Sequence, residues 1–461
     1  MALTQPRTLK QRVIHAGSWA VGGHVVQQAI RLGGNLLLTR LLVPEAFGLM
    51  AIVYVLMIGF ALFSDIGIGS NIVQNARGED PAFLNTAWTV QILRGIAIWL
   101  LALLAALALP FASGLGWVKA GTVYGDPMLP WVIAVFSFTA VISGFDSTNI
   151  AVARRKMQVR LLTQIEVASQ IVALILMAAL AWWSRSIWAL VVGGLVAAVV
   201  RCGLSHLVLA GTRNAIQLDK SSLNELLNFG KWIFVSSISG FLVINGDRLM
   251  LGGLVDAQTL GMYAIAFLLA NSLSLILGTL LGNVFFPALS QIARERPHDL
   301  AATLDKFQRL ADAFLLTASG FLIMAGSSIV ALLYDARYQA AGPMLSLLAV
   351  GCIGLRYQVV EQCYLAMGKP QIAAATNAFR MFVLYVGLPV AFYYHQFNGA
   401  MIAIVVSQYS GWPMAIYFKF KHGLMTLKGE SFAVPALLAG LALGALFQSL
   451  APTRMALRSL F

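Results

Sequence analysis

The sequence predicts an all-α protein that crosses a membrane many times, and three observations support this prediction. First, 59% of the 461 residues are hydrophobic and only 11% are charged, which is more apolar surface than a water-soluble domain needs. Second, apolar runs of about twenty residues, the length that spans a bilayer, recur throughout the chain. Third, a stretch of helix, hinge and helix is repeated half a chain apart, which is typical of membrane transporters built from internal repeats.

The repeat relates residues 40–52, RLLVPEAFGLMAI, to residues 241–265, FLVINGDRLMLGGLVDAQTLGMYAI. In each copy a helix ends at a short hinge and a second apolar run follows. The offset is about 212 residues, so the chain divides into two helical halves. The matched pairs are Leu42-Val43 with Leu254-Val255, Gly48 with Gly261, and Ala51-Ile52 with Ala264-Ile265.

Thirteen spans are expected from the apolar runs. They should be helices, because a segment inside the hydrocarbon must satisfy its own backbone hydrogen bonds. The basic start is expected to lead into a retained first span, since polar residues such as Gln27 and Asn35 are unlike a cleavable signal peptide. We expect a six-helix bundle over residues 1–212, a second over 213–424, and an extra helix and tail over 425–461. The expected spans are 14–39, 46–70, 84–109, 128–151, 162–183, 187–210, 228–254, 261–288, 310–333, 342–366, 371–394, 399–418 and 433–450.

Two connections are expected to form interfacial helices. Ser222 and Glu225 fit a capping box at the join between the halves. Pro297 is placed to start a helix within residues 294–309.

The distribution of Lys and Arg predicts the orientation. Loops on one side of the membrane hold eighteen of them, including the run Arg154-Arg155-Lys156, and loops on the other side hold six. Basic residues concentrate in cytoplasmic loops. The N-terminus is therefore expected in the cytoplasm.

Seven basic residues lie inside the expected spans, and most are difficult to explain as helix ends. Four of them, one in each of four spans, lie about ten residues from a cytoplasmic end, roughly 15 Å deep and near the middle of the bilayer. An arginine there costs roughly 2.5–3.5 kcal/mol on insertion scales, so these side chains should face a polar interior and meet anions. Guanidinium groups match phosphate oxygens in a bidentate fashion, which makes phosphate the expected ligand. The seven are the four midplane arginines Arg94, Arg201, Arg356 and Arg380, together with Arg31, Lys231 and Arg248.

Internal pairing is the alternative role for these arginines, since acids also lie within the spans. Asp247 and Arg248 are neighbours in sequence, and either ion coupling or helix pairing would explain Asp247. The intramembrane acids are Asp65, Asp146, Glu166, Asp247 and Glu361.

Other classes of protein are disfavoured by what the sequence lacks. It contains no GxSxG, HExxH, paired CxxC or Walker A motif, so no catalytic residue, metal site or cofactor is expected. The net charge of +13 includes no basic stretch interleaved with aromatic residues outside the expected spans, so no nucleic-acid partner is expected. The cysteines Cys202, Cys352 and Cys363 all fall in spans and are expected to be buried apolar residues.

The stretch at residues 40–74, RLLVPEAFGLMAIVYVLMIGFALFSDIGIGSNIVQ, resembles the first hinge and second span of the polysaccharide transport (Wzx-type) flippases. These belong to the multidrug/oligosaccharidyl-lipid/polysaccharide (MOP) exporter superfamily. The family's second motif corresponds here to GDRLMLGGLVDAQTLGMYAIAFLLANSL, which is followed by VFFPALSQ at residues 284–291. The resemblance implies two six-helix bundles around a central cationic cavity, and a cargo of undecaprenyl-pyrophosphate-linked oligosaccharide. It also implies the bacterial inner membrane, a monomer, and a polysaccharide polymerase and chain-length regulator as partners.

The predicted function is therefore the flipping of exopolysaccharide or O-antigen repeat units, with Arg94, Arg201, Arg356 and Arg380 holding the pyrophosphate and Arg31 assisting. A flippase for the lipid II-type peptidoglycan precursor is an alternative with similar cargo. A cation-coupled multidrug exporter is disfavoured, because bases outnumber acids in the spans. A membrane glycosyltransferase or polymerase is disfavoured by the short outer loop at residues 110–127, where Asp126 is the one acid.

Overall fold

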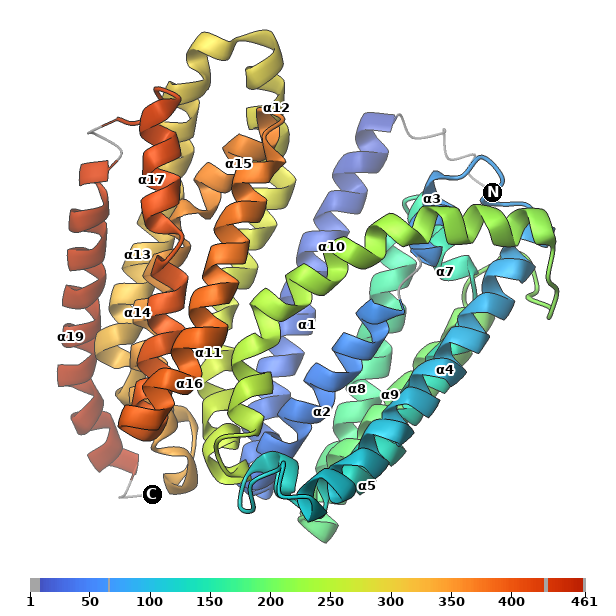
Figure 1. The fold of residues 1–461 in the computed structure, drawn as a ribbon, viewed down its shortest axis with the longest axis horizontal. Helices are drawn as coiled ribbons and strands as arrows, with labels where there is room; N and C mark the ends of the chain where they lie inside the picture. Colours follow the sequence, from blue (N-terminus) through green and yellow to red (C-terminus); the bar gives the residue numbers. More distant parts are fainter. Residues whose placement is uncertain (1–8, 65–66, 427–429, 459–461) are drawn as a thin grey trace. The chain divides into compact units, whose positions relative to one another are not determined.

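The computed structural model describes residues 9–64, 67–426 and 430–458, which are predominantly helical and include no β-strand (Figure 1). Within these residues, nine helices are long and apolar enough to cross a membrane, or ten if one bent pair counts as a single span. The predicted all-α, multi-pass class is thereby confirmed. The α-helices are α1 Leu9–Leu41, α2 Pro44–Phe63, α3 Ile68–Gln74, α4 Pro81–Gly114, α5 Leu129–Phe136, α6 Phe138–Gly144, α7 Asn149–Arg155, α8 Val159–Ser184, α9 Trp188–Leu207, α10 Lys220–Gly252, α11 Ala257–Leu280, α12 Phe286–Glu295, α13 Leu300–Leu333, α14 Ala341–Ile353, α15 Gln358–Ala366, α16 Pro370–Tyr409, α17 Trp412–Lys421 and α19 Ala433–Arg458.

Short 3-10 and π turns connect several of these helices. The 3-10 turns are η1 Val123–Gly125, η3 Pro297–Asp299, η4 Ala336–Tyr338 and η5 Gly354–Tyr357, and the π turn is η2 Leu281–Phe285.

Each expected span coincides with one helix or with consecutive helical segments. The expected spans 371–394 and 399–418 share α16, which turns at His395 and Gln396, where the backbone leaves helical geometry. Gln396 has a φ of +50°, in the left-handed region that disfavours a side chain. This turn separates two apolar arms of one long helix.

The chain forms two compact units, Met1–Phe241 and Leu242–Phe461, and their boundary lies inside α10. In the first unit, α8 packs against α1 and α9, and α4 packs against α5 and α6. In the second unit, α13 packs against α14 and α19, and α11 against α14. The approach of α19 to α13 is close, since a Cβ on Gly440 would lie 2.2 Å from the carbonyl oxygen of Thr317.

The repeated hinge folds in a similar way in both copies. In the first, extended Val43 precedes Pro44, the first residue of α2, a position where the missing N–H of proline has no consequence. In the second, Asp256 caps α11 by accepting a hydrogen bond from the backbone nitrogen of Thr259 at 2.7 Å. Different residues therefore start equivalent helices.

The fourth expected span is broken. The helical pair Leu129–Gly144 and Asn149–Arg155 bends by 62°. Such a break leaves backbone carbonyls without helical partners, and these must be satisfied within the protein. Gln91 of α4 does this, because its Nε2 lies 3.2, 3.1 and 3.0 Å from the carbonyl oxygens of Ser143, Gly144 and Asp146.

The two expected interfacial helices are not separate helices. α10 is helical from Lys220 through to Gly252, and its first turn is capped by Asp219, which accepts hydrogen bonds from the backbone nitrogen (2.9 Å) and hydroxyl (2.7 Å) of Ser222. The predicted capping box at Ser222 and Glu225 is therefore wrong, because the capping residue is Asp219, three residues earlier. Glu225 instead accepts a hydrogen bond from Arg77 at 3.0 Å. Pro297 opens a 3-10 turn, after which α13 runs without interruption from Leu300 to Leu333.

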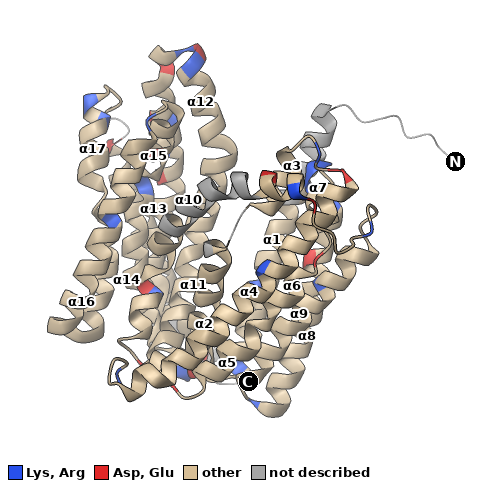
Figure 2. Ribbon diagram, turned by 45° about the vertical axis from the view of Figure 1, so that its right-hand side comes forward, with Lys and Arg blue, Asp and Glu red and all other residues tan. Residues whose placement is uncertain are grey.

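Charged residues gather at helix ends, as Figure 2 shows near α3 and α7 in the first unit and at the ends of α12 and α17 in the second. This distribution suits a chain whose helices cross hydrocarbon. The few charges along the helix lengths include the predicted site residues Arg94, Arg201 and Arg380.

Candidate functional site

The first unit contains a cavity of about 500 Å³ bounded by α2, α3, α4, α6, α7 and α9. Its described walls carry three arginines and one aspartate: Arg94, Arg154, Arg201 and Asp146. Tyr54, Thr139, Ser143 and Thr148 add hydroxyl groups. The cavity therefore combines an excess of positive charge with neutral hydrogen-bonding groups.

Arg94 extends from α4 to the end of α2. Its Nε donates to Ser64 Oγ at 3.1 Å and its Nη2 to the carbonyl oxygen of Ala61 at 2.6 Å. These contacts hold the guanidinium at the cavity wall, half-buried.

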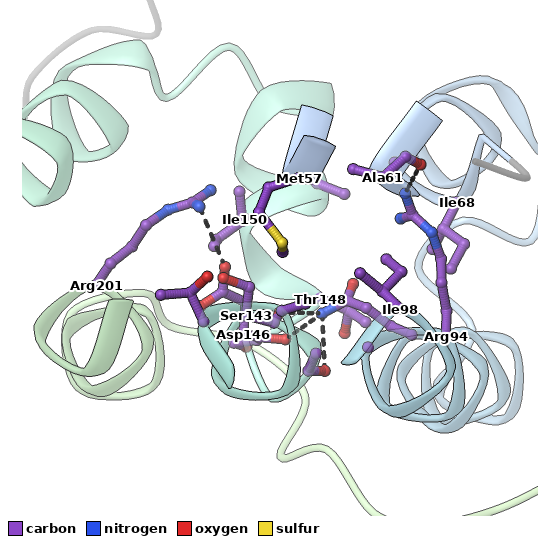
Figure 3. A pocket seen from close by; sticks show the side chains of 18 of the residues that line it. Met57, Ala61, Ile68, Arg94, Ile98, Ser143, Asp146, Thr148, Ile150 and Arg201 are labelled. Carbon is purple, nitrogen blue, oxygen red and sulfur yellow. Dashed lines mark hydrogen bonds and ion pairs between the residues drawn. The ribbon is translucent and has the colours of Figure 1, made fainter. Parts of the chain in front are cut away.

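Arg201 reaches the cavity from α9, on the other side of the opening from Arg94 (Figure 3). Its Nη1 lies 3.4 Å from Asp146 Oδ2 and its Nε lies 3.2 Å from Glu166 Oε1. Arg201 thus pairs with two of the predicted intramembrane acids, Asp146 and Glu166, which corresponds to the alternative role of internal pairing. Its side chain nevertheless keeps 30% of its surface exposed and lines the cavity.

The break between α6 and α7 places Asp146 in this cavity. Ser147, the next residue, donates its backbone N–H to Ser205 Oγ at 2.9 Å and its hydroxyl to Asn214 Oδ1 at 3.0 Å. Asn214 Nδ2 in turn donates to Thr148 Oγ1 at 2.6 Å. The non-helical backbone is therefore fixed by side chains from α9 and from the segment that leads to α10.

A smaller cavity of about 120 Å³ adjoins the first and shares Ile150, Arg154 and Arg201 with it. Gln27 of α1 and Glu166 of α8 also line it. Arg154 is exposed, and among the described residues its guanidinium has no ion-pair or hydrogen-bond partner. The sequence does not single out Arg154, because it is the first of three consecutive basic residues in a connection between expected spans.

In the second unit, Arg356 is buried and fully engaged. It forms a fork on Asp312, with Nε 3.0 Å from Oδ1 and Nη2 2.7 Å from Oδ2, and its Nη1 lies 2.8 Å from Glu430 Oε2. Glu430 also accepts a hydrogen bond from Lys419 at 2.6 Å. Two bases and two acids thus form a neutral cluster, and Arg356 is 5% exposed.

Arg380 and Glu361 form a second buried pair, with Arg380 Nη2 3.3 Å from Glu361 Oε1. The structure thus joins two predicted site residues to each other. Both are less than 10% exposed.

Asp247 and Arg248 lie in α10, also in the second unit. The hydroxyl of Tyr263 in α11 donates to Asp247, while Arg248 lies over the ring of Phe267, 4.2 Å from its centroid, and donates to Asn245 at 2.8 Å. These contacts tie α10 to α11 and fit the expected pairing role. Ion coupling through Asp247 stays a prediction.

Arg31 is exposed on α1 and does not line either cavity described above. Asp65, the remaining predicted acid, lies outside the described residues.

Within the described residues, no group of three His, Cys, Asp or Glu side chains could hold a metal ion. The three cysteines are free, with Cys352 and Cys363 buried and Cys202 half-buried.

Comparison with known proteins shows the family. Residues 37–343 match the family described as polysaccharide biosynthesis protein. The chain belongs to this family. It is also similar to the lipopolysaccharide biosynthesis protein WzxC of Escherichia coli (strain K12), with 22% identity over 381 residues that cover 82% of this chain and 74% of that protein.

Solved structures show the fold. The lipid II flippase MurJ in an inward closed conformation is similar with a TM-score of 0.67 and 12% identity, over 97% of this chain and all of that one. An inward-facing multidrug resistance MATE family transporter of the MOP superfamily is similar with a TM-score of 0.62 and 13% identity, over 86% of this chain and 94% of that one. The polysaccharide biosynthesis family member described here therefore has the MOP fold, as its sequence motifs predicted, and the two solved structures are those of a flippase and a transporter.

Proposed function

We propose that this protein is a flippase that moves a polyprenyl-pyrophosphate-linked oligosaccharide repeat unit across the bacterial inner membrane. The observation that carries the proposal is an arginine-bearing cavity built at a broken span, in a chain of the polysaccharide biosynthesis family. Discontinuous helices near the middle of the membrane are where transporters of repeat architecture bind their substrates.

Arg94 and Arg201 are the proposed pyrophosphate contacts. Both remain partly exposed in the cavity, and guanidinium stays charged at any working pH. Asp146 and Glu166 hold Arg201 in place while phosphate is absent. Hydroxyl groups such as those of Ser143 and Thr148 suit a sugar head group.

Arg356 and Arg380 take a different role in this proposal. Their guanidinium groups already meet buried carboxylates. A phosphate would have to displace those carboxylates and leave them buried without a partner, which is strongly unfavourable. They are proposed to hold the second unit together, and the halves are proposed to alternate about the two repeated hinges.

The test is complementation of a strain that lacks the gene. Arg94→Ala and Arg201→Lys are expected to reduce surface polysaccharide at least about tenfold, the loss of one charge-assisted hydrogen bond, while protein abundance in the membrane stays normal. Lysine is chosen at position 201 because it keeps a cation beside the buried Asp146 but cannot bind phosphate in a bidentate fashion. Arg356→Ala and Arg380→Ala are expected to lower abundance as well. Normal export from the first two variants would overturn the cavity assignment.

A flippase for the peptidoglycan precursor is the second candidate, favoured by the similarity in fold to MurJ. Accumulated lipid in the deletion strain separates the two. An oligosaccharide repeat unit on the polyprenyl carrier supports the first proposal, and lipid II supports the second.

A further inference from the structure

An apolar groove lies beside the cationic cavity in the first unit, and the proposed function leaves it unused. It has a volume of about 550 Å³ and runs between α1 and α8. Trp19, Gly22 and Val26 line it from α1, and Val167 and Ile171 from α8. Val26 and Ile171 each expose more than 40% of their surface. The groove is therefore open and apolar.

The groove adjoins the smaller polar cavity. Thr163 lines both the groove and the small cavity. The small cavity in turn shares Arg154 and Arg201 with the large one. The apolar groove, the smaller polar cavity and the larger cationic cavity thus lie next to one another in the first unit.

The polar end of this series carries Arg154, which has no ion-pair partner among the described residues. Arg154 is exposed at the junction of the two polar cavities. A second arginine, Arg160, lies over the ring of Trp19 at the groove, 5.4 Å from its centroid. Positive charge at one end and apolar walls at the other match a lipid that has one chain and a phosphate head.

We propose, on the basis of the proposed function, that the first isoprene units of the carrier lipid lie in the α1–α8 groove while its pyrophosphate meets Arg154 in addition to Arg201, which lines the same two polar cavities. A groove bounded by two helices suits the single chain of a polyprenyl lipid better than the two chains of a phospholipid. A chain that leaves the bilayer for this groove gains little hydrophobic energy. The groove therefore orients the lipid, and the charge-assisted contact with Arg154 provides the affinity.

Photocrosslinking tests the position of the chain. A diazirine amino acid is placed at Ile171, in the groove, or at Ile175, which is exposed on the same helix but outside it. The purified full chain in nanodiscs is given radiolabelled undecaprenyl pyrophosphate. Labelling is expected at least about fivefold stronger from position 171 than from position 175, because diazirines react with what they touch.

Matched variants separate the two parts of the site. Gly22→Leu should fill the groove, since a Cβ there meets nothing within 4 Å, and Gly33→Leu is equally uncrowded on the same helix but outside the groove. Arg154→Gln should reduce labelling about tenfold, the factor for one charge-assisted hydrogen bond, whereas Arg213→Gln removes an exposed charge that lines none of the three cavities. Gly22→Leu and Arg154→Gln are expected to lower labelling, and their controls are not.

Three outcomes would overturn the groove assignment: equal labelling from both positions, equal effects of Gly22→Leu and Gly33→Leu, or competition by phosphatidylglycerol as effective as by unlabelled carrier. The proposed function fails separately, in the complementation test. A deletion strain that keeps its surface polysaccharide would refute that function whatever the crosslinking result.

Discussion

At the scale of single residues, what distinguishes one intramembrane arginine from another is the partner that it meets. Arg356 meets carboxylates with three of its nitrogens and is almost completely buried. Arg201 also meets two carboxylates, yet it keeps part of its surface open to a cavity. Arg154 meets none among the described residues. Whether one of these arginines can bind a ligand therefore depends on its exposure and its ion-pair partners more than on its depth in the membrane.

The buried cluster in the second unit leads to a stability prediction. Arg356→Ala leaves Asp312 buried without its partner, and such a change costs about 3–5 kcal/mol. We expect a large fall in the melting temperature of the purified protein, measured by scanning fluorimetry in detergent. The double variant Arg356→Met with Asp312→Leu should recover much of the loss, because no uncompensated charge remains.

The control for this prediction is Arg337, which pairs with Asp335 and whose side chain is 40% exposed. Arg337→Ala should change stability by at most about 1 kcal/mol, the usual range for a surface pair. Equal effects of the two single variants would contradict the structural role of the cluster.

At the scale of elements, the broken span is the feature that creates the site. The bend between α6 and α7 turns backbone toward the cavity, and the Gln91 amide lies within hydrogen-bond distance of three carbonyls there. Gln91→Leu removes these contacts at once. The Ser143 carbonyl keeps the backbone N–H of Asp146 at 3.2 Å, so the loss falls on the carbonyls of Gly144 and Asp146. Each buried acceptor that loses its partner costs about 1–3 kcal/mol, so we expect lower thermal stability and lower export together.

Trp88→Phe is the matched control for Gln91→Leu. It removes one hydrogen bond, of 3.3 Å, to the carbonyl of Phe145, and that carbonyl keeps His206 Nε2 at 2.8 Å. Export should stay close to wild type. A harmless Gln91→Leu would show that the break does not need its side-chain support.

The start of α10 gives a prediction of pH dependence. Hydrogen bonds from the backbone and hydroxyl of Ser222, then from Ser221, lower the pKa of Asp219 to about 2. Because the folded pKa lies below the ordinary value, this cap stabilises the helix start fully above about pH 4 and loses its effect as the pH falls toward 2. Hydrogen exchange of the amides of residues 221–226 should therefore accelerate, relative to intrinsic rates, between pH 4 and 2. In Asp219→Asn this acceleration should be absent, and its persistence there would assign the transition to another group.

The sequence was sufficient to predict the helices but not the contacts between them. Apolar length and the repeat predicted the spans, since both depend on local composition. The partners of Arg356 lie 44 and 74 residues away along the chain, and no periodicity relates them. The break near Asp146 was missed because the expected span followed the apolar runs on either side of it. The polar, turn-forming residues 144–149, GFDSTN, were the available signal. Asp219 was missed as the cap because Ser222 and Glu225 offered the same motif three residues later.

At the scale of the whole molecule, the fold and the distribution of charge together define a topology. Loops rich in Lys and Arg alternate with loops that are poor in them, and such a bias orients a membrane protein. An odd number of spans, as the sequence predicts, would place the two ends of the chain on opposite sides of the membrane. The proposed orientation has the N-terminus in the cytoplasm.

Cysteine labelling tests this orientation in a chain whose three native cysteines are replaced by alanine. In the first unit, Lys156→Cys should react with a membrane-impermeant maleimide only after cells are permeabilised, whereas Arg185→Cys should react in intact spheroplasts, because α8 separates them. In the second unit, His298→Cys and Arg337→Cys, on either side of α13, should give the same contrast. A reversed pattern would invert the orientation. Equal labelling of the two positions in either unit would mean that the helix between them does not cross the membrane, which would contradict the span assignment itself.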